Sequence, residues 1–391
     1  MRNIETGKTS FRELNNLGKA NIPRYNNQNS AAKLRKILNQ SGGFSKGVFL
    51  RDEHSNQREK EIGYWAPLEG IKDPEKVLDY AKTADEIEFD SLAASSHFHP
   101  WRHTNTYATH VLPWLSVALE RTEQIEVGTG VICPTFRYHP GELAQVFASM
   151  DHMYPGRVFL GVGTGERLNE VPLGYEWPSY KERKERLIEA VKIVRLLWSE
   201  DFASYDGNYY SLKDANLYTK PKTEPPIYVA AEGPKSAEMA GRYGDGLFTP
   251  LPPNEKLKEE VLPSFEKGAE NEGKNPEDLE KAVETTISYH SDPEKALESC
   301  RHWGVTTLPG HIEKTHDPRQ FEKFEEKVTD EQLKEAFKIA TQPEEIISYI
   351  EKFLQLGFTK IFLHSTSPNE PKFLEVCERE IVPYFRDLWE K

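Results

Sequence analysis

The sequence has little cysteine and no long apolar run. Its 391 residues include three cysteines, an odd number of widely spaced thiols, which predicts reduced side chains rather than a disulfide framework. No Cys-x-x-Cys pair supports a structural zinc site. No apolar stretch has the length needed to cross a bilayer, and the N-terminus lacks the apolar core of a secretion signal. These absences predict a cytoplasmic protein that does not bind membranes.

Positive charge is also in deficit. The chain carries 50 lysines and arginines against 63 aspartates and glutamates, for a net charge of −13, and the basic residues are spread along it. This balance argues against sequence-independent binding of nucleic acid and against adhesion to an anionic membrane. We therefore expect a small-molecule partner and no nucleic acid. The length fits one large domain or two ordinary ones.

The texture of the sequence changes near residue 60. Residues 1–58 are polar and rich in Asn, Lys, Arg and Ser, which predicts a mostly irregular N-terminal extension with one helix near 30–39. After this extension, short apolar runs alternate with amphipathic segments of helical period. We expect strands at about 61–65, 91–95, 125–131, 158–160, 227–231, 244–249, 285–289 and 360–364.

Eight buried-type strands that alternate with helices predict one α/β domain at 59–391, a (β/α)8 TIM barrel. The mainly helical, charged residues at about 250–341 are expected to form an insertion between strands six and eight. An open doubly wound sheet is the alternative, but the chain has no Rossmann fingerprint. In a barrel, the chemistry belongs at the C-terminal ends of the strands. The run KERKER at 181–186 is expected to form a solvated helix face.

A glycine-rich turn follows the predicted fourth strand. Val158–Leu160 leads into Gly161, Gly163 and Gly165, and then into Glu166. The turn is not a Walker A loop, because no Gly-Lys-Ser/Thr follows, and it lacks the third glycine of a Rossmann loop. Bare backbone at such a turn allows a ligand to approach closely. A tight connection between a strand and a helix explains the same pattern.

Histidines gather after the predicted second strand, where residues 97–103 read His-Phe-His-Pro-Trp-Arg-His. An imidazole titrates near neutral pH, so His97 is the candidate for general acid–base catalysis. We expect His99, like the last histidine of the run, to hydrogen-bond a loop carbonyl. A His-x-His at a strand end is also typical of metal-dependent barrel hydrolases, which need further ligands. His290 and His364 complete no ordered ligand set, so we expect no metal and keep the hydrolase as a rival.

Two further glycine-containing loops follow strands three and five. In Gly128–Pro134 the glycine at 130 permits a bulge or a cis peptide. Ala230–Pro234 opens a helix whose first amides are free, which makes it an anion site. Together with the turn after strand four, these loops predict a pocket for a flat, phosphate-bearing cofactor beside His97. The residues alone thus indicate a cofactor-dependent barrel enzyme.

Several blocks, in a fixed order over about 60–391, carry a resemblance to a known family. They are His97–Arg102, Gly128–Pro134, Phe136–Pro140, Gly161–Glu170, Ala230–Pro234 and Gly241–Gly246. The segment resembles the luciferase-like coenzyme F420-dependent oxidoreductases, nearest the branch of glucose-6-phosphate dehydrogenases and hydroxymycolic acid dehydrogenases. The resemblance implies a TIM barrel, the deazaflavin F420 as cofactor, and a homodimer. It also implies hydride transfer between F420 and an alcohol or sugar-type carbon, carbinol or carbonyl.

The resemblance also implies roles for single residues. His97 would exchange the proton of the substrate hydroxyl, Glu166 would exchange a proton with the deazaflavin ring, and Trp101 would pack beside the reacting carbon and stabilise developing charge. Glu69 matches a substrate-side carboxylate. Gly130-Val131 matches a non-proline cis peptide that supports the ring. The implied cofactor contacts are Ser96, Gly130, Val131, Cys133, Thr164, Gly165, Asn169, Ala231, Glu232 and Gly233.

The chain departs from this family pattern at positions that bear on the substrate. Ser96 stands where the family usually has an aspartate just before the histidine. Residues 247–253 lack the base that grips phosphate in the glucose-6-phosphate enzymes, and Ala336 falls near their arginine, although Lys314 could match their insertion lysine. Because an unpaired phosphate dianion is costly to bury, we expect an alcohol or sugar other than glucose 6-phosphate.

Two rivals keep the barrel and change the function. One is an FMN-dependent luciferase-like monooxygenase or reductase, which would use the same strand ends to hold a flavin. The other is a non-catalytic protein that binds deazaflavin, an interpretation that the serine at position 96 suggests. The cofactor that the purified protein binds separates the first of these from an F420 enzyme. The effect of replacing His97 on turnover separates the second.

Overall fold

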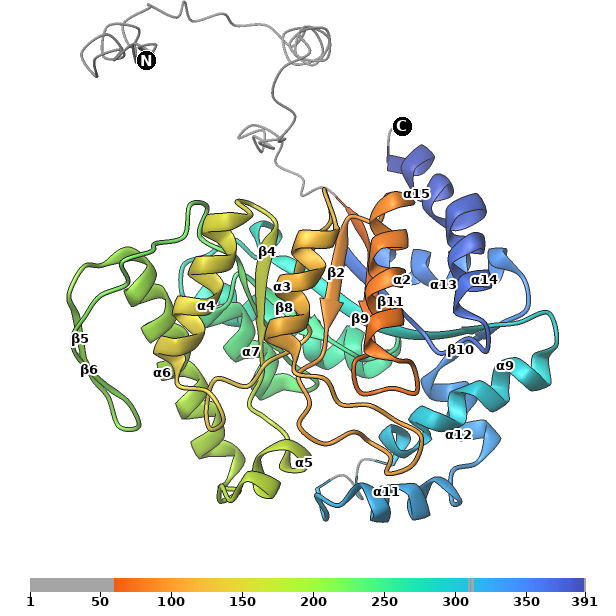
Figure 1. Cartoon of the computed structure of the whole chain (residues 1–391), viewed down its shortest axis with the longest axis horizontal. Coiled ribbons are helices and arrows are strands. Elements are labelled where there is room, and N and C mark those ends of the chain that lie inside the picture. Colours follow the sequence, from red (N-terminus) through yellow and green to blue (C-terminus); the bar gives the residue numbers. More distant parts are fainter. Residues whose placement is uncertain (1–59, 309, 311–312, 390–391) are drawn as a thin grey trace, which may run out of the picture. The chain divides into compact units, whose positions relative to one another are not determined.

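The computed structural model describes residues 60–308, 310 and 313–389. The predicted extension at 1–58 and its helix near 30–39 lie outside the described residues. Eight parallel strands close into a barrel, because β8 pairs with β9 and β11 pairs with β1 (Figure 1). The predicted (β/α)8 TIM barrel is confirmed. Its strands are β1 (Glu61–Ala66), β2 (Ser91–Ala94), β3 (Glu126–Thr129), β4 (Val158–Val162), β7 (Ile227–Ala230), β8 (Gly246–Thr249), β9 (Glu280–Tyr289) and β11 (Lys360–Ser365).

Helices surround the strands and bury their apolar faces against them (Figure 1). The first begins where the sequence predicts, since the Asp73 carboxylate accepts the Glu75 N–H and Pro74 occupies the first turn. Among the described helices, none is long and apolar enough to cross a membrane. The helices that pack around the barrel are α2 (Pro74–Glu86), α3 (Val111–Arg121), α4 (Pro140–Met153), α6 (Tyr180–Ser199), α7 (Pro234–Tyr243), α8 (Leu262–Asn271), α13 (Pro343–Gln355), α14 (Glu370–Val376) and α15 (Val382–Trp389).

Further elements extend the barrel, and α5, α9, α11 and α12 gather at one end of it, below the strands in Figure 1. An antiparallel hairpin, β5 (Ala203–Asp206) with β6 (Ser211–Ala215), follows α6. Short turns of 3-10 or π-helix are η2 (Val171–Leu173), η3 (Leu257–Val261), η4 (Pro276–Asp278) and η6 (Cys377–Ile381). The elements at the C-terminal ends of the strands are α5 (Arg167–Glu170), α9 (Pro293–Ser299), η5 (Cys300–Thr307), α11 (Pro318–Glu325) and α12 (Asp330–Ala336).

Two strand predictions are wrong in the region after β8. β9 begins at Glu280 rather than at 285, because charged residues in its first half hide the strand pattern. The predicted helical stretch up to 340 also contains a short strand, β10 (Lys338–Ala340), which pairs in parallel with residues 287–289 of β9. Strand β10 adds to the outer edge of β9 and does not belong to the closed barrel.

The barrel interior is filled by side chains that alternate along each strand. On β11, Ile361 and Leu363 face the helices, whereas Phe362 joins an inner aromatic cluster. That cluster consists of Trp65, Ala93, Phe159, Tyr228, Phe248, Ala282 and Phe362. The Phe248 and Phe362 rings stack with centroids 5.4 Å apart. The interior is therefore a packed layer that separates the two ends of the barrel.

On the N-terminal side of this layer lies a buried ammonium group, on Lys360 at the start of β11. The side chain is fully buried, and its Nζ atom lies 2.8 Å from the Glu61 carboxylate and also contacts the Glu126 carboxylate. The same ammonium lies over the rings of Phe159 and Tyr228, at 5.3 and 5.5 Å from their centroids. Because Glu61 and Glu126 begin β1 and β3, this ion network connects three strands at the N-terminal end of the barrel.

The network predicts a stability that falls as pH rises. Burial, with Glu126 and Glu280 nearby, raises the pKa of Glu61 to about 7, although Lys360 opposes the shift. At pH values between the pKa of Glu61 in the unfolded chain and its pKa in the folded protein, the folded protein holds a proton that the unfolded chain has lost. Stability therefore decreases with increasing pH in that window. We expect Tm to fall between about pH 5 and about pH 7.5, and Glu61→Gln to remove part of this slope.

Thermal unfolding of wild type and variant at several pH values measures the effect. Glu86→Gln is the matched control, because the Glu86 side chain is 61% exposed on α2. Equal slopes for Glu61→Gln and wild type would contradict the assignment of this titration to Glu61.

Candidate functional site

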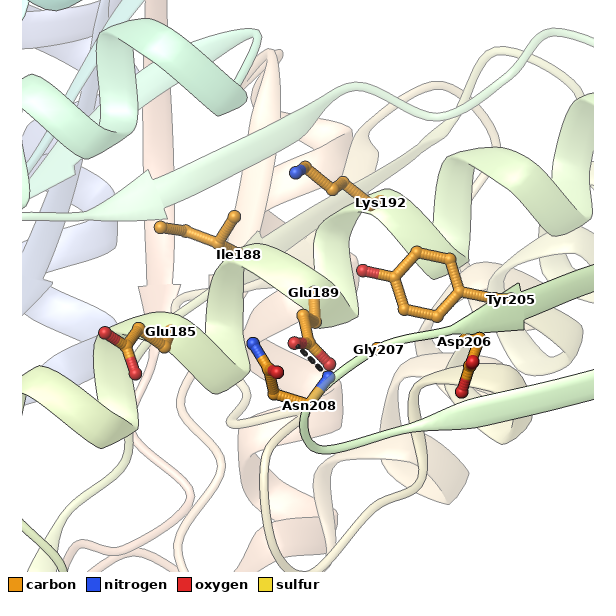
Figure 2. A pocket seen from close by; sticks show the side chains of 8 residues that line it. All are labelled: Glu185, Ile188, Glu189, Lys192, Tyr205, Asp206, Gly207 and Asn208. Carbon is orange, nitrogen blue, oxygen red and sulfur yellow. Dashed lines mark hydrogen bonds between the residues drawn. The ribbon is translucent and has the colours of Figure 1, made fainter.

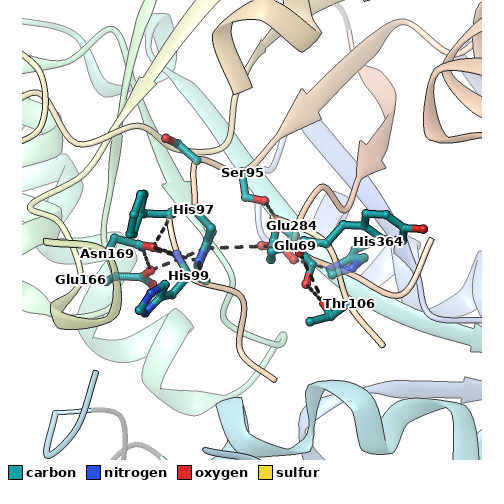
Figure 3. Close-up of polar contacts among 12 residues, drawn as sticks. Glu69, Ser95, His97, His99, Thr106, Glu166, Asn169, Glu284 and His364 are labelled. Carbon is teal, nitrogen blue, oxygen red and sulfur yellow. Dashed lines mark hydrogen bonds and ion pairs between the residues drawn. The ribbon is translucent and has the colours of Figure 1, made fainter. Parts of the chain in front are cut away.

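Three side chains from the ends of three strands meet at the mouth of the barrel (Figure 3). His97 follows β2, Glu69 follows β1 and Glu166 follows β4. The His97 Nε2 atom lies 3.6 Å from a Glu166 carboxylate oxygen and 4.0 Å from a Glu69 oxygen. The structure thus brings together the residues predicted to move protons, with one ring nitrogen of the histidine facing both carboxylates.

The other ring nitrogen of His97 faces the loop. Nδ1 lies 3.3 Å from the His99 carbonyl oxygen and 3.5 Å from the Asn169 side-chain nitrogen. An Nδ1–H that donates to the carbonyl leaves Nε2 as the atom that gains or loses a proton at the mouth. His99 itself places Nδ1 3.2 Å from the His316 carbonyl oxygen, which confirms that its ring bonds a loop carbonyl.

Asn169 on α5 connects the histidine loop to Glu166. Its Oδ1 atom accepts the N–H groups of Phe98 at 2.8 Å and of His99 at 3.3 Å. Its Nδ2 atom donates to the Glu166 carboxylate at 2.8 Å. The residue is buried, with 3% of its surface exposed. Asn169 was predicted as a cofactor contact, and the structure shows that it also fixes the relative positions of the two proton-transfer candidates.

Glu166 is a carboxylate with a raised pKa. Burial is the main cause; the neighbouring His97 opposes the shift and Glu69 adds to it. The side chain still exposes 40% of its surface, because it borders the mouth of the barrel rather than the core. A ligand that covered this surface would remove more water and raise the pKa further. The raised pKa favours the protonated carboxyl form of Glu166 over a wider pH range than in a free glutamate.

Other groups take the place of the aspartate that Ser96 replaces. The nearest carboxylates to the His97 ring are Glu69 and Glu166, and Ser95 donates its hydroxyl hydrogen bond to Glu69. Ser96 is buried, and its carbonyl oxygen accepts a hydrogen bond from Arg137 at 3.0 Å. The carboxylate beside the histidine therefore comes from Glu69, which follows β1 and is held by a serine. It does not come from the strand that carries His97.

Arg137 is itself held by a second buried carboxylate. Its Nε atom lies 3.1 Å from Glu170 on α5, and the two side chains are 7% and 0% exposed. Sequence reasoning placed this arginine in a family block without giving it a role. The pair connects the loop after β3 to α5 and, through the Ser96 carbonyl, to the histidine loop.

Trp101 packs between the histidine and the inserted helices. Its ring centroid lies 5.5 Å from that of His97 and 5.6 Å from that of Phe321 on α11. The residue is 7% exposed. Arg102 fixes the same loop to α11 by an ion pair with Glu322, at 3.1 Å. The segment between β9 and α13 therefore covers the side of the site on which the substrate is expected.

The loops predicted to hold a cofactor lie on the opposite side, after β3, β4 and β7. The Gly130–Val131 peptide bond is cis, as expected. Gly165 has a φ of +86°, and a Cβ atom there would lie 2.7 Å from the Cys133 sulfur, so this loop presents only backbone. The remaining predicted contacts are distributed as follows: Thr164 is half-buried before α5, and Ala231, Glu232 and Gly233 follow β7 and precede α7.

Glu232 is electrostatically part of the same site. Its pKa is raised by burial first, and then by Glu166 and Glu284, while Lys256 opposes the shift. The raised pKa of Glu232 thus depends in part on the Glu166 carboxylate, which follows β4. The helix that follows, α7, begins directly after Gly233, as the sequence predicts.

The KERKER run is only in part the solvated face that was predicted. Lys181 is 85% exposed. Arg183, in contrast, is 8% exposed, with its guanidinium 4.0 Å from the centroid of the Trp177 ring. Arg186 lies over the Tyr209 ring at 4.6 Å. The prediction is wrong for Arg183, because its aromatic partner lies outside the helix, where the helical periodicity gives no sign of it. Arg186 keeps the expected i,i+4 ion pair, with Glu182 at 2.8 Å.

No three His, Cys, Asp or Glu side chains in the described part of the chain lie close enough to hold a metal ion. His290 and His364, considered above as ligands, have other partners. The His290 Nδ1 atom accepts the Asp292 N–H at 2.9 Å, and the His364 Nδ1 atom lies 2.7 Å from Glu284. The metal-dependent hydrolase therefore has no ligand set among these residues.

Of two cavities in the described part of the chain, one adjoins the site and the other does not. One, of about 440 Å³, adjoins the site through His99 and reaches the start of α11 at Pro318. The other, of about 530 Å³, lies between α6 and the β5–β6 hairpin and contains none of the predicted site residues (Figure 2). There Glu189 accepts the Asn208 N–H at 2.8 Å, which holds the hairpin against the helix.

Known proteins resemble the chain over most of its length. Residues 45–360 match the family described as luciferase-like monooxygenase. The F420-dependent glucose-6-phosphate dehydrogenase of Mycolicibacterium gilvum is 40% identical over 84% of this chain and 99% of that protein. The enzyme of the same name from Microbacterium testaceum is 40% identical over 83% and 97%.

Solved structures give the same result. An F420-dependent secondary alcohol dehydrogenase, in complex with an F420-acetone adduct, is 38% identical and superposes with a TM-score of 0.80 over 83% of this chain and 99% of that one. A coenzyme F420-dependent tetrahydromethanopterin reductase from Methanopyrus kandleri, at 22% identity and a TM-score of 0.69 over 84% of this chain and all of that one, shares the fold.

Loss of the Asn169 amide should destabilise the protein measurably. Asn169→Ala removes hydrogen bonds to two backbone N–H groups and to one carboxylate in a buried place, and we expect a cost of about 1–3 kcal/mol in the free energy of unfolding. Urea denaturation measures this cost. His103→Ala, at an exposed position of the same loop, serves as the control and should change stability by less than about 0.5 kcal/mol. Equal effects of the two substitutions would contradict the connecting role of Asn169.

Proposed function

The chain belongs to the luciferase-like monooxygenase family, and we propose that it is a coenzyme F420-dependent dehydrogenase, or a reductase in the reverse direction, acting on a CH–OH carbon. The observation that carries the proposal is the His97 Nε2 atom lying between the Glu69 and Glu166 carboxylates. The similarity over nearly the full length of F420-dependent relatives supports the choice of cofactor.

The residues present fit a deazaflavin. The backbone-only turn at Gly165, the loop at Gly130-Val131 and the start of α7 after Gly233 would hold the ring and its phosphate-bearing tail. When bound, F420 supplies a carbon centre that exchanges hydride with the substrate. Glu166 borders the same turn, so its carboxyl group would hold the proton that the reduced ring requires.

His97 and Trp101 would act on the substrate. With Nδ1 directed to the His99 carbonyl, Nε2 is free to take the hydroxyl proton as the C–H bond breaks. The Glu69 carboxylate, 4.0 Å away, favours the imidazolium that results. Trp101, packed against the histidine ring and Phe321, would exclude water from the reacting carbon.

The substrate that the site supports is an alcohol or sugar without a phosphate group. Two cations that could otherwise meet a phosphate are paired with carboxylates, Lys72 with Glu370 and Arg102 with Glu322. Lys314, which could match the insertion lysine of the glucose-6-phosphate enzymes, is exposed. A phosphate dianion would therefore be buried beside carboxylates without its own partner, at a cost that a neutral alcohol avoids.

Binding and turnover of F420 test the proposal directly. We expect F420 fluorescence to report binding at micromolar concentrations and to decrease or recover as alcohols and ketones are converted. His97→Ala should lower kcat by about 10²–10⁴-fold and leave F420 binding intact, because it removes the base and not the cofactor loops. His103→Ala is the control and should retain wild-type activity.

Other outcomes favour the rivals. Yellow protein that purifies with FMN and does not bind F420 would support the flavin enzyme. Turnover that His97→Ala leaves unchanged would argue against the catalytic role of this histidine. F420 binding without turnover of any alcohol, aldehyde, ketone or sugar would support the non-catalytic binding protein.

The raised pKa of Glu166 predicts the pH dependence of F420 reduction. A group that must donate a proton is active below its pKa, so kcat should decline as pH rises through the raised value. Glu166→Gln cannot donate, and we expect a lower kcat in which this alkaline decline is absent. Rapid-mixing measurements of F420 reduction across pH check both points. An alkaline decline that persists in Glu166→Gln would assign it to another group.

The oligomeric state and location remain predictions from the sequence and its resemblance. We propose a cytoplasmic homodimer of the F420 enzyme. Light scattering coupled to size-exclusion chromatography measures the mass in solution, and a monomer at micromolar concentration would contradict the dimer.

A further inference from the structure

A second acid–histidine pair lies on the C-terminal side of the aromatic layer of the barrel. Because side chains alternate along a strand, Glu284 on β9 faces the same way as the inner residue Ala282, and His364 on β11 faces the same way as Phe362. Both are two residues closer to the C-terminal end of the barrel than their partners in the layer. They therefore lie at the floor of the mouth, where Figure 3 shows them near Glu69 and away from Glu166 and Asn169.

The histidine of this pair is held rigidly. Its Nδ1 atom lies 2.7 Å from the Glu284 carboxylate, and its side chain is 3% exposed. The ring stacks on Trp65 with centroids 5.8 Å apart and meets the edge of Trp303 at 4.7 Å. A neutral His364 donates its Nδ1–H to one oxygen of Glu284, so the ring sets the orientation of the carboxylate.

Glu284 is the member of the pair that can meet a ligand. Its side chain is 19% exposed, whereas the free nitrogen of His364 is buried. A carboxylate in this position accepts hydrogen bonds and repels anions. It favours a ligand with a hydroxyl donor at that place.

On the basis of the proposed function, we propose that Glu284, oriented by His364, binds a second hydroxyl of the substrate. The substrate class is then a neutral polyol or sugar, in which His97 faces the reacting hydroxyl and Glu284 accepts a hydrogen bond from another. A simple secondary alcohol would leave the carboxylate without this donor. Because Glu284 would contact the bound substrate away from the reacting carbon, it determines specificity, and His364 is a positioning residue.

The test compares substrates that differ by single hydroxyl groups. Initial rates of F420 reduction are measured with 2-propanol, 1,2-propanediol, glycerol and D-sorbitol, for wild type, Glu284→Gln and His364→Gln. We expect Glu284→Gln to raise KM for the polyols that wild type prefers by about 10- to 100-fold and to leave kcat/KM for 2-propanol unchanged. His364→Gln should change the same KM values in the same direction. F420 binding by both variants should match wild type, as should all rates of Glu86→Gln, the exposed control.

Equal losses for 2-propanol and the polyols in Glu284→Gln would overturn the inference, as would wild-type polyol kinetics in that variant. Failure of the proposed function is distinguishable, because it appears as absence of F420 binding or of all turnover in wild type. In that case saturation-transfer NMR with D-sorbitol tests the site alone. Transfer in wild type that Glu284→Gln abolishes supports the site, and transfer that is absent in wild type or unchanged in the variant overturns it.

Discussion

The ammonium group of Lys360 determines how the rest of the barrel is arranged. The amine is buried there beside two acidic side chains, Glu61 and Glu126, and against the faces of two aromatic rings. The acidic partners begin β1 and β3, and β11 pairs with β1 in the register that places Lys360 opposite Glu61. With that register fixed, the residues two and four positions later, Phe362 and His364, fall in the aromatic layer and at the mouth. The geometry of the site thus depends on a charge at the opposite end of the barrel.

At the mouth, negative charge is concentrated, and the hydrogen bonds show how the fold holds it. Asn169 bonds Glu166, Ser95 bonds Glu69 and His364 bonds Glu284. Each of these acidic side chains is therefore oriented by a hydrogen bond from a neutral group. This arrangement suits a reaction in which protons leave and arrive while the cofactor carries the hydride.

The sequence allowed prediction of the barrel and of part of the site. Apolar strands and glycine-rich strand ends marked His97 and Glu166, since a barrel brings all C-terminal strand ends to one place. The start of β9 and strand β10 could not be predicted, because charged residues such as Glu280 read as solvent-exposed when their buried partners are unknown. The roles of Ser95, Arg137 and the Glu284–His364 pair were missed for a related reason. Each role exists only through contacts between residues distant in sequence. Two signals were available in the sequence. Alternation along β9 places Glu284 on its inner face, and His364 lies at the end of a strand.

The packing of Trp101 against Phe321 has an evolutionary consequence. The proposed proton-transfer residues, His97 and Glu166, follow β2 and β4, whereas Trp101 packs against Phe321 from the segment between β9 and α13. These residues lie on different segments of the chain, so mutations can change the outer segment while the acid–base geometry stays intact. A lineage can exchange one alcohol for another in this way.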